Sequence, residues 1–64
     1  MKYYCPKDLR FYQVLWECKM KDPNTGEWKE AVIYSQVLNS EGQCGEEKFV
    51  REKEDFINKF QAIN

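Results

Sequence analysis

The chain has 64 residues, of which 16% are aromatic, and its ten basic and eleven acidic residues give a formal net charge of −1. A chain of this length forms a single domain, residues 1–64, whose core rarely supplies more than about 3–5 kcal/mol unaided. The aromatic content disfavours a disordered chain, and the near-neutral charge disfavours the strongly basic class of nucleic-acid-binding domain.

The first segment, residues 2–5, predicts a short strand at the edge of a sheet. Pro6 follows it and marks its end, because proline keeps the preceding Cys5 extended and has no N–H to donate to a neighbouring strand. We therefore expect a turn directly after this strand.

The stretch with the clearest pattern is residues 11–37, which predicts one long β-hairpin with arms at about 11–21 and 27–37. Pro23 presets φ for the turn between the arms, and Gly26 supplies the positive φ needed at its exit. Alternation along the first arm predicts a half-buried strand. The residues expected together on one face of that arm are Tyr12, Val14, Trp16, Cys18 and Met20.

The two ends of this hairpin differ in polarity. Its base, at residues 12–15 and 32–37, is apolar on both faces and is therefore expected to form the core. Its tip carries charged residues on one face and is expected to be half-exposed, including Trp28. Trp16 and Trp28 are candidates for a cross-strand pair, which would add about 0.2–1 kcal/mol.

The C-terminal third predicts a loop, a strand and a helix. Residues 39–46 are polar and rich in glycine, which indicates a loop, and residues 48–51 predict a short strand. Helical spacing of apolar residues then predicts a short helix at about 52–62, whose apolar stripe closes the sheet. A closing strand in place of this helix, and a helix that binds a partner, are the alternatives. The residues that carry the spacing are Phe56, Ile57, Phe60 and Ile63.

Catalytic and metal-binding patterns are missing from the sequence. The chain has no histidine, the commonest general base, so we expect a non-enzyme without catalytic residues. Cys5, Cys18 and Cys44 are odd in number and unpaired in spacing, which disfavours a disulfide framework, a metal site and any cofactor. No apolar run approaches membrane length and no apolar leader precedes the domain, so we expect no membrane contact and a cytoplasmic location.

Four short motifs follow one another along the chain: Tyr12-x-Val14-Leu15, Thr25-Gly26-Glu27, Val32-Ile33-Tyr34, and Val50-Arg51 with Phe56 after it. This pattern resembles a family of small bacterial and phage domains of unknown function, which read Y-x-V-L, T-G-E, V-V-Y and V-R-P-x-x-x-F. The resemblance implies an SH3-like small β-barrel and an origin in a phage or mobile element. Glu52 stands where the family has proline, and this favours a longer helix after residue 51.

The expected fold is mainly β: a small SH3-like barrel or curled antiparallel sheet, built on the long hairpin, with a short C-terminal helix. The first functional hypothesis is a non-catalytic binding or adaptor module that docks on another protein. A small-barrel nucleic-acid-binding protein and a structural homo-oligomeric unit are the alternatives. For each candidate contact the other interpretation is a place in the core. The candidate partner-binding residues are Tyr3, Tyr4, Phe11, Trp28 and Tyr34.

Overall fold

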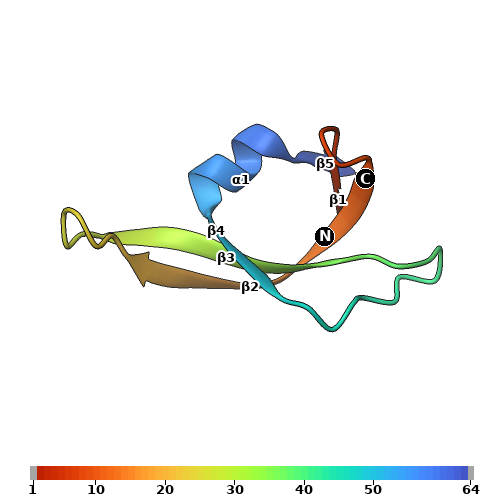
Figure 1. Cartoon of the computed structure of the whole chain (residues 1–64), viewed down its shortest axis with the longest axis horizontal. Helices are drawn as coiled ribbons and strands as arrows, with labels where there is room; N and C mark the ends of the chain where they lie inside the picture. Colours follow the sequence, from red (N-terminus) through yellow and green to blue (C-terminus); the bar gives the residue numbers. More distant parts are fainter. Residues whose placement is uncertain (1, 64) are drawn as a thin grey trace.

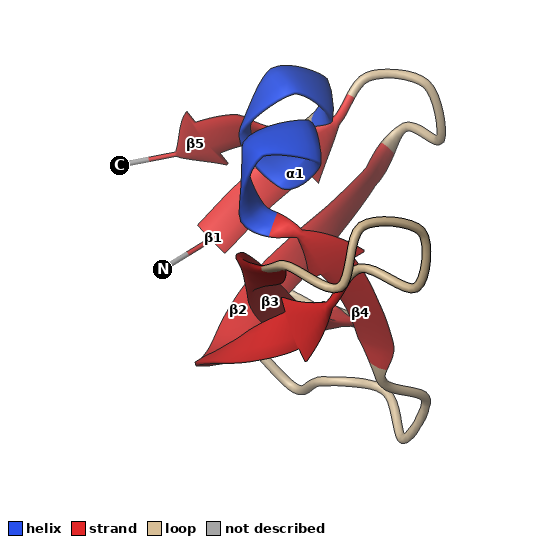
Figure 2. Cartoon of the chain, turned by 90° about the vertical axis from the view of Figure 1, so that its left-hand side faces the viewer, coloured by secondary structure: helices blue, strands red, loops and turns tan. Residues whose placement is uncertain are grey.

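The computed structural model describes residues 2–63 and shows one sheet of five antiparallel strands with a short helix over one face. The elements are β1 (Lys2–Cys5), β2 (Arg10–Lys21), β3 (Trp28–Gln36), β4 (Phe49–Glu52), α1 (Lys53–Lys59) and β5 (Gln61–Ile63). Figures 1 and 2 show that the sheet curls, so that β1 and β5 rise beside α1 while β2, β3 and β4 lie beneath it. The predicted fold class, a mainly β curled sheet with one short helix, is confirmed.

The strand order is β4-β3-β2-β1-β5, with the predicted long hairpin, β2 and β3, at its centre. In the turn, the Gly26 N–H donates to the Asp22 carbonyl and the Asp22 N–H donates to the Glu27 carbonyl, both at 2.8 Å. Gly26 has a φ of 75°, which agrees with the conformational role predicted for it. Within residues 2–63, β4 and β5 are the two edge strands and do not pair with each other, so the sheet is open and does not close into a barrel.

A β-bulge at Leu15 changes the phase of β2. Val14 lies opposite Tyr34 and Trp16 lies opposite Ile33, so Leu15 is an extra residue without a partner on β3. Directly opposed residues share a face of the sheet, and neighbours along a strand alternate. The prediction that Trp16, Cys18 and Met20 share a face with Tyr12 and Val14 is therefore wrong. They lie on the face that points away from α1, which we call the outer face, whereas Tyr12 and Val14 lie on the inner face.

The C-terminal segment forms both the predicted helix and the closing strand that was considered in its place. α1 ends at Lys59, three residues earlier than predicted, and β5 follows at Gln61. Phe60 is extended, with φ −117° and ψ 145°, and its N–H still donates to the Phe56 carbonyl. The helix stops here because the following residues pair with the outer edge of β1, with Ile63 opposite Lys2.

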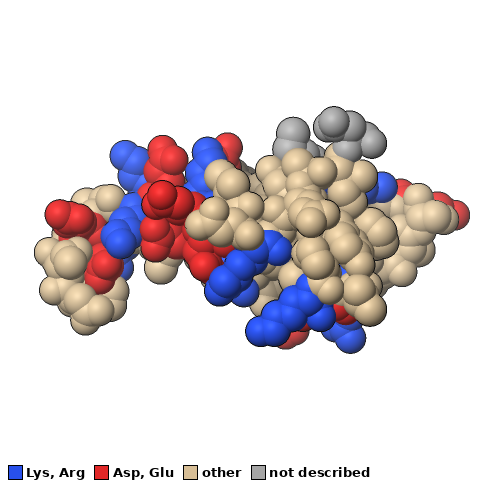
Figure 3. Space-filling view, turned by 90° about the horizontal axis from the view of Figure 1, so that it is seen from above, with Lys and Arg blue, Asp and Glu red and all other residues tan. Residues whose placement is uncertain are grey.

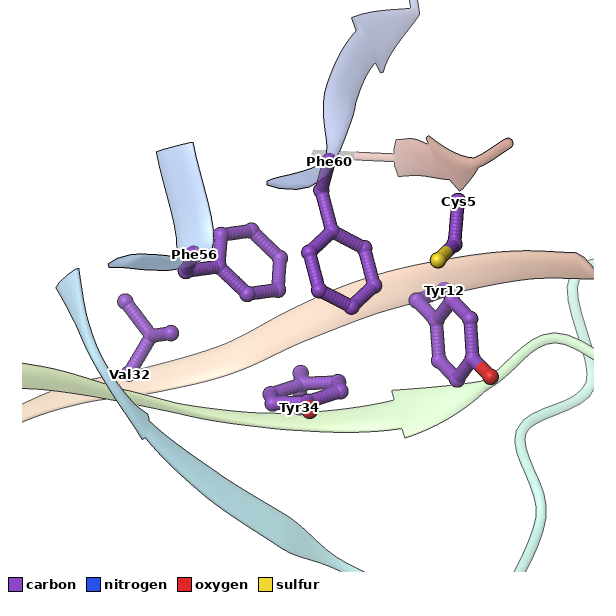
Figure 4. Close-up of a cluster of buried hydrophobic side chains, with 6 residues drawn as sticks. All are labelled: Cys5, Tyr12, Val32, Tyr34, Phe56 and Phe60. Carbon is purple, nitrogen blue, oxygen red and sulfur yellow. The ribbon is translucent and has the colours of Figure 1, made fainter. Parts of the chain in front are cut away.

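The hydrophobic core lies between α1 and the inner face of the sheet (Figure 4). Phe56 and Phe60 stack with ring centroids 4.2 Å apart, and Tyr34 meets Phe60 edge to face at 5.4 Å. Aromatic pairs of this kind contribute about 0.5–1.5 kcal/mol each beyond the burial of their area. The buried members of this cluster are Cys5, Tyr12, Val32, Tyr34, Phe56 and Phe60.

Part of the outer face, around Gln13 and Ser35, is covered by the segment of residues 37–48, which joins β3 to β4. Ser35 is fully buried on this face, and its Oγ lies 2.7 Å from the carbonyl oxygen of Gly45 and 2.9 Å from that of Glu47, so its single O–H donates to one of them or is shared between the two. A bridge between Val37 and Cys44 holds the start of the segment close to β3. The segment therefore covers the sheet near Ser35 and leaves the part nearer the hairpin turn exposed.

Candidate docking surface

Three apolar side chains form a row across the outer face. The register places Trp16 of β2 opposite Ile33 of β3, and Ile33 opposite Val50 of β4, so all three share one face. Trp16 is 72% exposed and Val50 is 57% exposed. Large apolar side chains that lie together on a sheet and are exposed to water often mark an interaction site.

Cys18 and Met20 continue this surface along β2 toward the hairpin turn. Cys18 lies opposite Ala31, and Met20 opposite Lys29, on the same outer face. We call the surface formed by Trp16, Cys18, Met20, Ile33 and Val50 the outer patch.

Charges beside the outer patch compensate one another. Lys29 Nζ lies 3.3 Å from Asp22 Oδ2 and 3.9 Å from Glu52 Oε2. The hydrogen bond to Asp22, with the nearby charge of Glu52, raises the pKa of Lys29. The pKa of Asp22 is lowered, first by the Asn24 backbone N–H that it accepts and then by Lys29. The rim of the patch therefore has polar groups but no strong charge of one sign.

The inner face of the hairpin tip carries mainly charged side chains, with Trp28 as its exposed apolar residue. Lys53, at the start of α1, lies with its Nζ 2.7 Å from Glu17 Oε1 and 3.9 Å from Glu30 Oε2. The hydrogen bond from Lys53 to Glu17 raises the pKa of the lysine. Figure 3, which views the molecule from the α1 side, shows acidic and basic groups interspersed over this part of the hairpin. This face is a solvated surface of mixed charge.

A cleft of about 500 Å³ opens between the β1–β2 turn, β4 and α1. Tyr12, Tyr34, Phe49 and Phe60 supply its aromatic wall, and Arg51 is its most constrained charged group. Because the Tyr12 hydroxyl is partly desolvated and donates to Asp8 at 3.1 Å, the pKa of Tyr12 is raised.

The charges in this cleft are held by the protein itself. Arg51 Nε donates to the Tyr34 hydroxyl oxygen at 3.3 Å, and its Nη1 donates to Asp55 Oδ2 at 2.7 Å. These bonds raise the pKa of Arg51 above its usual range, while Arg51 and Lys59 together lower the pKa of Asp55. The guanidinium also lies 5.6 Å from the centroid of the Phe60 ring. This network links β3, β4 and α1. Its charged groups are paired with one another within the protein, so we interpret it as a network that holds these elements together.

The five residues predicted to bind a partner do not form one surface. Tyr34 is only 5% exposed and belongs to the core, and Tyr3 is half-buried with its ring 4.8 Å from that of Phe56. Tyr4 and Phe11 contact each other at 5.1 Å on the outer side of β1 and β2. Trp28 is 66% exposed beside the turn, where it lies opposite Lys21. The expected pairing of Trp16 with Trp28 is therefore wrong.

Trp16 was missed as a residue of the outer face because strict alternation along β2 does not allow for the bulge at Leu15. The only local signal is that Val14, Leu15 and Trp16 are three apolar residues in succession, which strict alternation does not accommodate. Such a run is compatible with a bulge, but only the pairing with β3 shows where the extra residue lies.

Among residues 2–63, no group of three or more cysteine, aspartate or glutamate residues is arranged to hold a metal ion, and all three cysteines are free. α1, the one helix in that range, is too short and too polar to cross a membrane. Comparisons of the chain with protein-family models, with curated proteins and with solved structures found no match.

Proposed function

We propose that this chain is a small, non-catalytic protein-binding module whose partner docks on the outer patch. The observation that supports it is the apolar row of Trp16, Ile33 and Val50, which lies on a rigid three-strand surface and is not covered by residues 37–48. Binding here removes a large aromatic surface from water, and Trp is among the residues that most often dominate interface energy.

The chemistry of the patch specifies the kind of partner. Its centre is apolar, and the adjacent ion pairs of Lys29 with Asp22 and Glu52 leave little net charge at its rim. A partner that presents apolar side chains within a polar surround matches this arrangement. Nucleic acid matches it less well, because affinity for phosphate requires basic side chains that are free to replace counterions. Four basic residues, Lys29, Arg51, Lys53 and Lys59, are instead engaged in ion pairs.

The experiment compares capture of proteins from a bacterial lysate by the tagged wild-type chain and by two variants. Trp16→Ser removes the most exposed side chain of the outer patch, and Ile57→Ser removes an exposed apolar side chain of α1 as a matched control. We expect one partner to be retained by the wild type and by Ile57→Ser, with affinity for Trp16→Ser lower by about tenfold or more.

Unfolding curves of the three proteins accompany this comparison, so that a loss of binding is not confused with a loss of folding. A partner that binds Trp16→Ser as tightly as the wild type contradicts the proposal. So does the absence of any partner that distinguishes the two variants.

A further inference from the structure

The second half of β2 has an open edge. β1 pairs with β2 only as far as Gln13, which lies opposite Lys2, whereas β2 continues to Lys21. Within residues 2–63, no strand therefore lies beside residues 15–21 on the side away from β3. Figure 1 shows this part of the hairpin extending past α1. An unpaired strand edge is a template for another strand.

The hydrogen-bonding phase of this edge follows from the turn. The Asp22 N–H donates to the Glu27 carbonyl, so residues 22 and 27 form a hydrogen-bonded pair. Hydrogen-bonded and non-bonded pairs alternate along an antiparallel ladder. Cys18 belongs to the second hydrogen-bonded pair beyond that of residues 22 and 27, so its backbone groups point toward β3, while those of Glu17 and Lys19 point outward. The open edge thus offers the N–H and C=O groups of alternate residues.

We propose that this edge pairs with the same edge of a second copy of the chain, antiparallel, about a two-fold axis at Cys18. In this register Glu17 lies opposite Lys19 of the other copy, and the symmetry produces this pair twice. Trp16 lies opposite Met20 of the other copy, a favourable contact between an aromatic ring and sulfur. Each copy's outward-directed backbone groups at 17 and 19 meet those of the other.

Other registers fit less well. A two-fold axis at Lys19 places that lysine opposite itself, and an axis at Glu17 does the same for two carboxylates, which destabilises a strand pair. The axis at Glu17 also extends the pairing into the part of β2 that β1 occupies. A shift by one residue places Cys18 opposite Glu17 or Lys19 of the other copy, so that side chains of different faces meet and the backbone groups are mismatched. Cys18 is the midpoint of residues 15–21, so its register uses the whole open edge.

The charged side chains near the edge permit this pairing. Lysines on an exposed edge usually discourage association, but here each Lys19 meets a Glu17 of the other copy. Lys53 contacts Oε1 of Glu17, and the Glu17 side chain remains 63% exposed, so it can accept a second cation. Pairing would also place the two outer patches side by side on one continuous sheet. The inference does not rest on the proposed function, since it concerns the strand edge and a second copy.

A charge-exchange experiment tests the register, with sedimentation equilibrium as the measurement. We expect the wild type to dimerise with a dissociation constant below about 1 mM, the range of weak association. Glu17→Lys and Lys19→Glu, each alone, create two like-charge pairs across the axis and raise that constant about tenfold. An equimolar mixture of the two variants regains the wild-type affinity, because each pair is again of opposite charge.

The mixture is the decisive sample. If each substitution acted only on the fold of its own chain, its effect would persist in the mixture, whereas a direct contact between residues 17 and 19 of two chains is restored there. A wild type that stays monomeric up to about 1 mM overturns the proposal. So does a mixture that associates no better than its components.

Cross-linking through Cys18 locates the axis. In a non-hydrogen-bonded antiparallel pair the Cα atoms lie about 4.5 Å apart, within the range that a disulfide spans. Diamide accepts the two hydrogen atoms that the two thiols lose when the S–S bond forms. We expect a covalent dimer of the wild type that Cys18→Ser does not form, with Cys5 and Cys44 present in both proteins. A covalent dimer that persists in Cys18→Ser places the contact elsewhere and contradicts the proposal. A wild type that is dimeric by sedimentation but forms no covalent dimer with diamide contradicts it too.

Discussion

The two faces of the sheet differ in how they place the aromatic residues of the same strand, β2. Tyr12 of β2 is 7% exposed on the inner face, where it packs with Tyr34 and Phe60, while Trp16, four residues later, is 72% exposed on the outer face. Both side chains are large and aromatic, so hydrophobicity does not explain the difference. The bulge at Leu15 does, because it moves the later part of β2 into the opposite phase.

The coverings of the two faces also differ in kind. α1 covers the inner face with two stacked phenylalanine rings, so its contribution is the burial of apolar area. Residues 37–48 cover the part of the outer face around Ser35, and their contacts with it are hydrogen bonds, including those of the Ser35 hydroxyl. Loss of the α1 packing should therefore unfold the core. Loss of the Ser35 hydrogen bonds should only loosen residues 37–48, which the core does not require.

Phe56→Ala should produce the largest effect. Phe56 is 1% exposed and contacts Tyr3, Tyr34 and Phe60. Truncation of a buried phenylalanine costs about 3–5 kcal/mol, which is comparable with the whole stability expected of a domain this small. We expect Phe56→Ala to be largely unfolded in water, as measured by circular dichroism and urea titration.

Ile57→Ala, the neighbouring change on α1, is the control. Ile57 is exposed, and surface substitutions usually stay within about 0.5 kcal/mol. Similar losses for the two variants would mean that the inner face is not held by its aromatic cluster.

Ser35→Ala should have an intermediate effect. The variant removes the buried hydroxyl whose single hydrogen serves the carbonyl oxygens of Gly45 and Glu47, and so leaves both without that donor. Loss of a buried donor of this kind costs about 1–3 kcal/mol. We expect hydrogen exchange to accelerate in residues 37–48 while the amides of β2 and β3 stay protected.

Ser40→Ala is the matched change within the same segment, at an exposed position. It should leave both the urea midpoint and the exchange pattern unchanged. Equal acceleration in β2 and β3 after Ser35→Ala would show that the outer covering and the core unfold as one unit.

The features that sequence predicted well are those set by neighbouring residues. The hairpin turn followed from Pro23 and Gly26, whose backbone preferences act locally. The helix followed from the spacing of Phe56 and Phe60, both of which lie in the core. For Trp28, an exposed position near the tip was expected, and the structure shows it there.

The features that sequence missed depend on partners distant in the chain. The bulge at Leu15 exists because Val14 and Trp16 pair with consecutive residues of β3, and no single strand shows that register. β5 forms because β1 offers it an edge, a contact between the two ends of the described chain. The outer patch depends on the bulge, so its most exposed residue, Trp16, could not be separated from the core by alternation alone.

Acidification should produce the smallest effect, through the network that links the inner face to α1. Asp55 lies 2.7 Å from Arg51 and 3.2 Å from Lys59, and these partners lower its pKa below the ordinary value of 3.8. A carboxylate with a lowered pKa stabilises the fold above its unfolded pKa, and this contribution is lost as pH falls through the folded pKa. The urea midpoint should therefore be flat near neutral pH and fall below about pH 4.

Asp55→Asn should lower the midpoint slightly at pH 7 and reduce the part of the acid-induced loss that Asp55 contributes. Asp22, whose pKa is also lowered, should retain its own part of that loss. Glu54→Gln provides the control, because Glu54 is exposed on the same helix and forms no ion pair among the described residues. If Asp55→Asn and Glu54→Gln show the same dependence on pH, the bonds from Arg51 and Lys59 contribute nothing to holding α1 on the inner face.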